Sequence, residues 1–162
     1  MFKTIIVPLD GSRFSSNALK YAIDIVNHYK ARLVLVRAVE RTVPVATAGA
    51  SIGVETATSS RLAIEAAETE DLIKERQAKQ YMRKKVREVA AKDIKADYRV
   101  VMGDPYESIM DICKQEKADL VVMTTHGKSG LKRAILGSVA DKIMRDARVP
   151  VLAIRPKSHK RK

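Results

Sequence analysis

Cysteine is nearly absent from this chain of 162 residues, and that scarcity limits its chemistry. The one cysteine, Cys113, cannot form an internal disulfide, and it cannot alone supply the ligands of a zinc site. It falls on the apolar side of a predicted helix, so we expect a buried and unreactive thiol. A disulfide framework and a cysteine-based metal centre are therefore excluded within one copy of the chain.

Long apolar runs are missing and aromatic residues are few. No run approaches the roughly 20 apolar residues that span a membrane. The first apolar run is short and soon reaches Asp10, unlike a signal peptide, so we expect a cytoplasmic protein. Aromatic residues make up only 4% of the chain, whereas nucleic-acid modules usually stack bases on aromatic rings. We therefore do not expect nucleic acid or a membrane as the partner.

Basic residues exceed acidic ones by 31 to 19, which gives a net charge of +12. Such an excess favours anionic partners, but it does not by itself choose among nucleotides, nucleic acid and membrane surfaces. Part of the excess lies in the segment 157–162, which lacks apolar residues and is expected to be a disordered tail. The remaining residues, 1–156, have the length of one domain.

Short apolar runs alternate with amphipathic segments along the chain. We predict strands at 5–9, 33–36, 98–102, 120–123 and 150–154. We predict helices that begin after Ser12 as N-cap, near Arg61 after a loop at 41–60, after Asp104 as N-cap, and at Ser138. The long second helix, 61–92, should bury a stripe that includes Ile73, Met82, Val86 and Val89. This order predicts a single-domain α/β fold, with a five-stranded parallel sheet and helices on both faces.

Ligands of such sheets bind outside the carboxyl ends of the strands, where the strand order reverses. Asp10, Gly103 and the segment 124–127 each follow a predicted strand, so they should crowd the same rim. The segment 123–138 (MTTHGKSGLKRAILGS) is the most informative of these. Its glycines allow close backbone approach, and Gly137-Ser138 opens a helix whose free N–H groups suit a phosphate. The competing interpretation is a tight loop followed by a simple helix cap. No Walker motif and no G-x-G-x-x-G is present.

The segment resembles the nucleotide loop of the universal stress protein family, whose ATP-binding members show G-x-x-G, nine residues, then G-[ST]. Gly127, nine residues and Gly137-Ser138 match the second part, whereas Thr124 replaces the first glycine. Residues 6–12 (IVPLDGS), 101–105 and 150–154 resemble the family's first strand and acidic turn, third-strand turn and last strand. The resemblance covers about 2–155 and implies a Rossmann-like fold of the adenine nucleotide alpha hydrolase type.

The resemblance also implies a nucleotide-binding role for each matching position. Contacts to the nucleoside would come from Pro8, Asp10, Val36 or Arg37, Met102, Gly103, Met123 and Thr124. Contacts to the phosphates would come from Gly127, Gly137, Ser138 and Val139. The implied ligand is ATP or another adenine nucleotide with Mg²⁺ or Mn²⁺, and no metal ligand is assigned. The Thr124 side chain either crowds the ribose or donates a hydroxyl hydrogen bond to it.

The residues around the loop do not form a set of acid, base and nucleophile, although His126 lies within it. We therefore expect no catalytic residues and at most slow ATP hydrolysis. The expected function is a nucleotide-responsive regulatory module in stress response, and the alternative is a protein-interaction module of the same fold that binds no nucleotide. In the family, the last strand, here Val151–Ile154, lies at the sheet edge and pairs in a homodimer. Exposed edges need such a partner.

Overall fold

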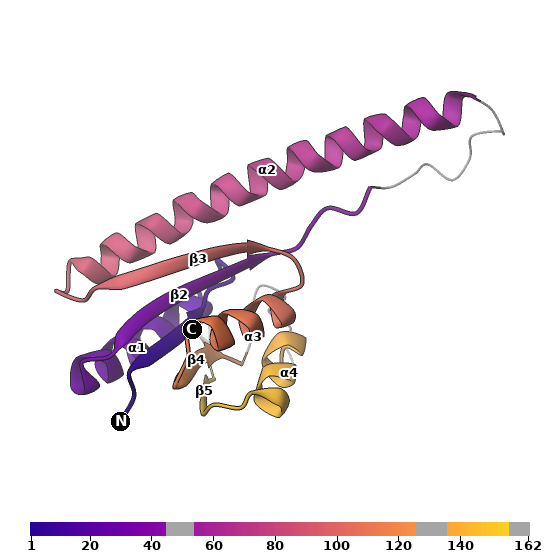
Figure 1. Cartoon of the computed structure of the whole chain (residues 1–162). Helices are drawn as coiled ribbons and strands as arrows, with labels where there is room; N and C mark the ends of the chain where they lie inside the picture. The colour runs from indigo at the N-terminus through magenta and orange to yellow at the C-terminus, as the bar shows by residue number, and fades with distance from the viewer. Residues whose placement is uncertain (45–53, 126–135, 156–162) are drawn as a thin grey trace, which may run out of the picture.

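The structure is a computed structural model that describes residues 1–44, 54–125 and 136–155, with side chains omitted for 54–58. Strands and helices alternate along these residues (Figure 1). The strands are β1 (Thr4–Pro8), β2 (Arg32–Val39), β3 (Ala96–Met102), β4 (Leu120–Thr124) and β5 (Val151–Ile154). The helices are α1 (Ser15–Tyr29), α2 (Val54–Ala90), α3 (Pro105–Gln115) and α4 (Ser138–Asp146).

The strands form one five-stranded sheet in the order β3-β2-β1-β4-β5, and all four pairings are parallel. Alternate residues of the central strands face opposite helix layers. Ile5 and Val7 belong to a core with α1 and α2, whereas Ile6 and Val34 belong to a core with α3 and α4. The predicted α/β class, with helices on both faces, is confirmed. Cys113 is buried in the second core, and burial raises the pKa of its thiol to about 11.

Three local predictions near the first two helices were wrong. Ser12 is not the N-cap of α1, which begins at Ser15, although the Ser12 hydroxyl still accepts a hydrogen bond from the Ser15 N–H at 3.0 Å. The stretch 41–60 is not all loop, because α2 already begins at Val54. Ile73 is 52% exposed, whereas Met82 and Val89 are fully buried as predicted and Val86 packs against the same core.

The second helix is much longer than the sheet that it covers. Its 37 residues span about 55 Å, whereas the seven residues of β3 span about 23 Å. The second half packs on the sheet through Ala78, Met82 and Val89. The first half extends beyond the sheet (Figure 1), and Ile73 lies about half a turn around α2 from Met82, on the face turned away from the sheet.

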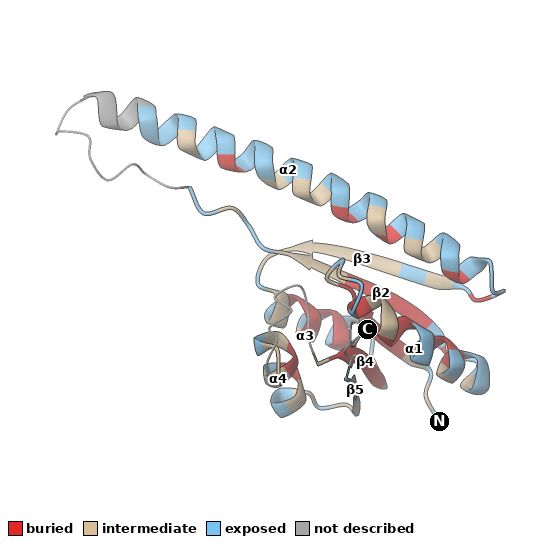
Figure 2. Cartoon of the chain, turned by 180° about the vertical axis from the view of Figure 1, so that it is seen from behind, coloured by how far each residue is buried: buried red, intermediate tan, exposed pale blue. Residues whose placement is uncertain are grey.

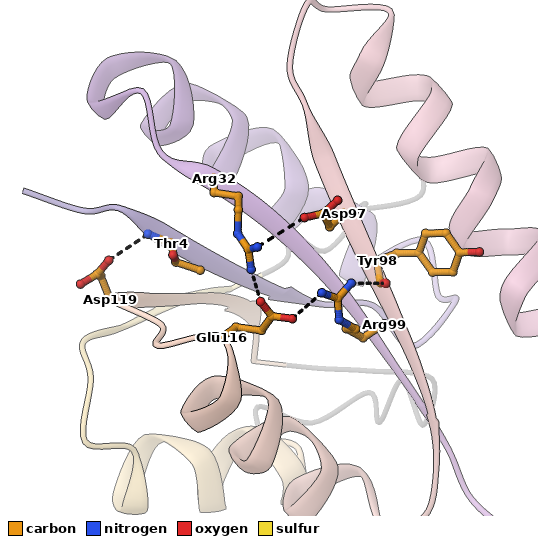
Figure 3. A network of polar contacts seen from close by, with 7 residues as sticks. All are labelled: Thr4, Arg32, Asp97, Tyr98, Arg99, Glu116 and Asp119. Carbon is orange, nitrogen blue, oxygen red and sulfur yellow. Dashed lines mark hydrogen bonds and ion pairs between the residues drawn. The ribbon is translucent and has the colours of Figure 1, made fainter.

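Polar contacts join the elements at the amino ends of the strands (Figure 3). Glu116, at the end of α3, forms ion pairs with Arg32 of β2 and with Arg99 of β3, the latter at 2.6 Å. The Asp119 carboxylate accepts hydrogen bonds from the Thr4 and Lys3 N–H groups, both at 2.8 Å. These contacts hold the ends of β1, β2 and β3 in register, on the side of the sheet away from its carboxyl rim.

We expect Asp119→Asn to reduce stability at neutral pH but not in acid. Hydrogen bonds from the Thr4 and Lys3 N–H groups hold the pKa of the Asp119 carboxyl below its usual range. Because the folded-state pKa is below the unfolded value, about 3.9, the carboxylate stabilises the fold above about pH 4 and loses that contribution as the pH falls through the folded-state pKa. Urea unfolding at several pH values measures the gap between wild type and variant. A gap that stays constant down to about pH 2 would contradict this account.

Candidate functional site

A cavity of about 760 Å³ opens at the carboxyl ends of β1, β2 and β4. The strand order reverses between β1 and β4, so the cavity lies where parallel α/β sheets bind ligands. Its walls come from the strand ends, from α2 on one side and from α3 and α4 on the other. Predicted site residues that line it are Pro8, Asp10, Val36, Met123, Thr124, Gly137, Ser138 and Val139.

Three predicted site residues are not brought to this cavity by the described structure. Met102 and Gly103 end β3, which β2 separates from the point of strand reversal, and neither lines the cavity. The Gly103 N–H instead donates to the Val39 carbonyl at 2.8 Å. Pro105 and Ile109 of α3 line the wall in their place. Gly127 lies outside the described residues.

The turn after β1 is held tightly against β2. The Leu9 N–H donates to the Val36 carbonyl at 2.8 Å, and Arg37 Nη1 donates to the Leu9 carbonyl at 3.1 Å. Gly11 has a φ of +82°, and a Cβ there would lie 3.0 Å from Arg37 Nη1. Only glycine suits this backbone and this space. The Asp10 carboxylate accepts the Ser12 N–H at 2.9 Å, which fixes the carboxylate at the cavity rim.

Arg37 supplies a half-buried cation to the cavity wall. Its guanidinium lies 5.9 Å from the centroid of the Tyr81 ring. Burial lowers the pKa of Arg37, and the nearby Asp10 and Tyr81 oppose that shift, so the guanidinium stays charged at neutral pH. The Nε atom is buried and has no hydrogen-bond partner among the described residues.

One wall of the cavity was missed by sequence reasoning. Lys74, Gln77, Ala78 and Tyr81 of α2 line it, and their spacing places them on a single face of the helix. That spacing was visible in the sequence, but it does not say which strand ends the face will meet. The Lys74 Nζ also donates to Thr42 Oγ1 at 2.8 Å, which ties the helix to the segment that leaves β2.

The amino end of α4 faces the cavity from the opposite side. Gly137 is the N-cap and its N–H donates to the Thr125 carbonyl at 2.8 Å. Ser138, Val139 and Ala140 occupy the first turn and line the cavity. N–H groups in the first turn of a helix have no acceptor within the helix, and the helix dipole adds positive potential there. This end of the cavity suits an anionic group.

The described residues include neither a cluster of metal-binding side chains nor a membrane-spanning helix. Among them, no group of three or more histidine, cysteine, aspartate or glutamate side chains is arranged to hold a metal ion. None of the described helices is long and apolar enough to cross a membrane.

Known proteins are similar to this chain in sequence and in fold. The protein MJ0531 of Methanocaldococcus jannaschii, a universal stress protein, is 33% identical over 96% of this chain and 83% of its own length. The solved structure of MJ0577, from the same organism, is 25% identical, covers 97% of this chain and 98% of its own, and has a TM-score of 0.75.

Two solved structures with lower identity are complexes with nucleotides. One is a universal stress protein in complex with cAMP, at 22% identity, TM-score 0.58, and coverage of 94% of this chain and 97% of its own. The other is a universal stress protein family protein of Arabidopsis thaliana with AMP bound, at 16% identity, TM-score 0.57, and coverage of 96% and 93%. These two likenesses support the fold.

The model of the universal stress protein family matches residues 1–155, which is nearly the whole chain. This match agrees with the resemblance drawn from the motifs, and with a sheet whose carboxyl rim holds the cavity. The chain belongs to the universal stress protein family.

Proposed function

We propose that the cavity binds an adenine nucleotide and that the protein acts as a nucleotide-responsive regulatory module in stress response. One observation carries the proposal: the cavity brings the β1 turn and the amino end of α4 to opposite sides of one space. Pro8, Asp10 and Val36 offer a surface for the nucleoside, and Ser138 and Val139 in the first turn of α4, next to Gly137, offer N–H groups for phosphates. The cAMP and AMP complexes of related folds support this ligand class.

The proposed ligand is ATP with Mg²⁺ or Mn²⁺, bound along the segment 124–138. The cation would arrive with the triphosphate, whose oxygens are the ligands that Mg²⁺ prefers. Arg37 fits the same ligand class, because it lines the cavity and is charged at neutral pH, which suits an anionic ligand. Regulation by occupancy of the site is proposed, with at most slow hydrolysis of the bound ATP.

Calorimetry tests the proposal directly. We expect heat on titration with ATP and Mg²⁺, and smaller affinities for ADP and AMP, because fewer phosphates reach the amino end of α4. Titration with GTP tests the preference for the adenine base. Titration with ATP and a chelator tests whether the divalent cation is needed. Adenine absorbance in the solution released from the denatured protein would show a ligand carried through purification. If no adenine nucleotide gives heat at millimolar concentration, the proposal fails and an interaction module without nucleotide takes its place.

We expect Thr124→Gly to tighten nucleotide binding. Thr124 ends β4, is only 6% exposed and lines the cavity, so its β-branched side chain adds stiff bulk beside the ligand. Thr124→Ser is the matched control, since it removes the methyl group and keeps the hydroxyl. Tighter binding by both variants identifies crowding. Weaker binding by the glycine variant alone identifies a hydroxyl hydrogen bond, and a change below about 0.5 kcal/mol for both would mean that neither effect operates.

A further inference from the structure

The half of α2 beyond the sheet carries a concentration of exposed apolar side chains. Leu62, Leu72 and Ile73 are 61%, 66% and 52% exposed, and Ile64 lies between them in the sequence and is also exposed. These four make up nearly half of the large hydrophobic side chains that are exposed among the described residues. Leu62 and Ile73 lie on one face of the helix, about three turns apart, and exposed apolar side chains that share a helix face can serve as contacts with a partner.

Leu62 and Ile73 belong to one line of residues with a 4-3 spacing, which runs from residue 62 to residue 87 of α2. Its members are Leu62, Ala66, Thr69, Ile73, Arg76, Gln80, Arg83 and Arg87. At 3.6 residues per turn, the line lies about half a turn from Met82 and Val89, which pack on the sheet. It therefore runs along the outer face of α2, which Figure 2 shows as largely exposed. A 4-3 spacing is that of the contact line in a two-stranded coiled coil; here its large apolar members are Leu62 and Ile73, and its second half is Arg and Gln.

The charges of α2 are segregated along its length. Residues 61–75 hold five acidic and two basic side chains, whereas 76–90 hold six basic and one acidic. Ion pairs within the helix use Glu70, Lys74, Glu75, Lys79, Lys85 and Glu88. Glu65 and Glu68 in the first half, and Arg83, Lys84 and Arg87 in the second, have no ion pair among the described residues. The two halves of α2 are therefore complementary in charge.

We propose that two copies of this chain associate through the outer face of α2, with the two helices antiparallel about a twofold axis between Ile73 and Arg76. This axis pairs Leu62 of one copy with Arg87 of the second copy. The arginine stem covers the leucine, and the guanidinium reaches the neighbouring Glu65. Because the axis is twofold, the acidic half of each copy meets the basic half of the other.

Two observations fit this pairing. A hollow of about 550 Å³ runs along the basic half, lined by Gln77, Gln80, Tyr81, Arg83, Lys84 and Arg87, and it would receive the apolar half of the second copy. The sheet lies on the opposite side of α2, so the two domains stay apart when the outer faces meet (Figure 1). The interface shares no residue with β5, so it operates whether or not the sheet edges pair.

Charge exchange tests the proposal on the full chain. One variant carries Arg83→Glu, Lys84→Glu and Arg87→Glu, and the other carries Glu65→Lys, Glu68→Lys and Glu70→Lys. Each variant alone is expected to raise the dissociation constant of the α2 contact about tenfold or more, because like charges then face each other. When the two variants are mixed in equal amounts, the dissociation constant should return to the wild-type value, because both halves of the helix pair are again complementary in charge. Analytical ultracentrifugation at low salt measures the association, and circular dichroism checks that each variant is folded.

Orientation is tested by cross-linking, which the burial of Cys113 makes selective. Leu62→Cys and Arg87→Cys chains, mixed and oxidised, should form a disulfide-linked heterodimer, whereas Leu62→Cys alone should give little homodimer. Raising the salt from about 0.05 to 0.5 M should lower the yield of the disulfide-linked heterodimer, because exposed charges are then screened. The proposal is overturned if mixing does not restore association, if Leu62→Cys links to itself as readily, or if the basic half binds only heparin or anionic vesicles.

Discussion

Gly137→Val is expected to abolish measurable nucleotide binding while the domain stays folded. Gly137 has a φ of −63° and a ψ of 143°, which any residue adopts, so the reason is space and not backbone strain. A Cβ at Gly137 would lie 3.3 Å from the Thr125 carbonyl oxygen, which already accepts the Gly137 N–H at 2.8 Å. A branched side chain must therefore turn the amino end of α4 or fill the cavity where the phosphates are proposed to lie.

The expected loss is large, because several hydrogen bonds to a charged group are removed together. Each such bond contributes about 1.5–3 kcal/mol, so losing two weakens affinity by roughly 100-fold or more. Gly137→Ala is the matched control and should cost less, since one methyl group displaces the turn by only a few tenths of an ångström. Calorimetry measures the affinity and circular dichroism the fold. Unchanged ATP affinity in a folded Gly137→Val protein would show that Gly137 serves only the loop.

We expect Ala153→Pro to convert a homodimer into a monomer. The prediction rests on the proposal that β5, which lies at the edge of the sheet, pairs antiparallel with its copy across a twofold axis. The Val121 N–H donates to the Pro150 carbonyl and the Thr125 N–H to the Ile154 carbonyl. Because backbone groups alternate along a strand, those of Ala153 face the open edge. Proline at 153 thus removes a donor from the edge while keeping the bonds to β4.

Light scattering at micromolar concentration gives the mass of both proteins. The β5 pairing is expected to be at least as tight in 0.5 M salt as in dilute buffer, because it joins backbone groups and apolar side chains while the basic C-terminal segments repel each other less. Ala153→Val, which keeps the N–H, should remain a dimer. A wild-type monomer in both buffers would refute pairing through β5. The response to salt also distinguishes the two contacts, because high salt should weaken the α2 contact and leave the β5 contact at least as tight.

Most of the helices and strands were predictable from local sequence features alone. The helix that follows Asp104 begins with Pro105 in its first turn, and the Asp104 carboxylate caps it by accepting the Glu107 N–H at 2.9 Å. The last helix, Ser138–Asp146, begins at the predicted residue. Caps, apolar periodicity and strand-ending glycines act over a few residues, so the printed sequence contains all that they need. The alternation of strands and helices predicted that the strands run parallel and that their carboxyl ends meet at one rim.

Other features depended on which elements meet in three dimensions. Ile73 was assigned to the buried stripe, yet it lies about half a turn around α2 from Met82 and Val89; apolar residues occur on more than one face of this helix, and only the packing shows which face meets the sheet. The cavity wall of Lys74, Gln77, Ala78 and Tyr81, and the absence of Met102 and Gly103 from the cavity, follow from the position of β3 outside β2. Contacts between residues far apart in the sequence arise from register and strand order, which are settled only when the sheet is packed. The sequence alone thus determined the family, the fold and most of the rim, while the tertiary structure decided which helix closes the cavity and which surface of α2 stays exposed.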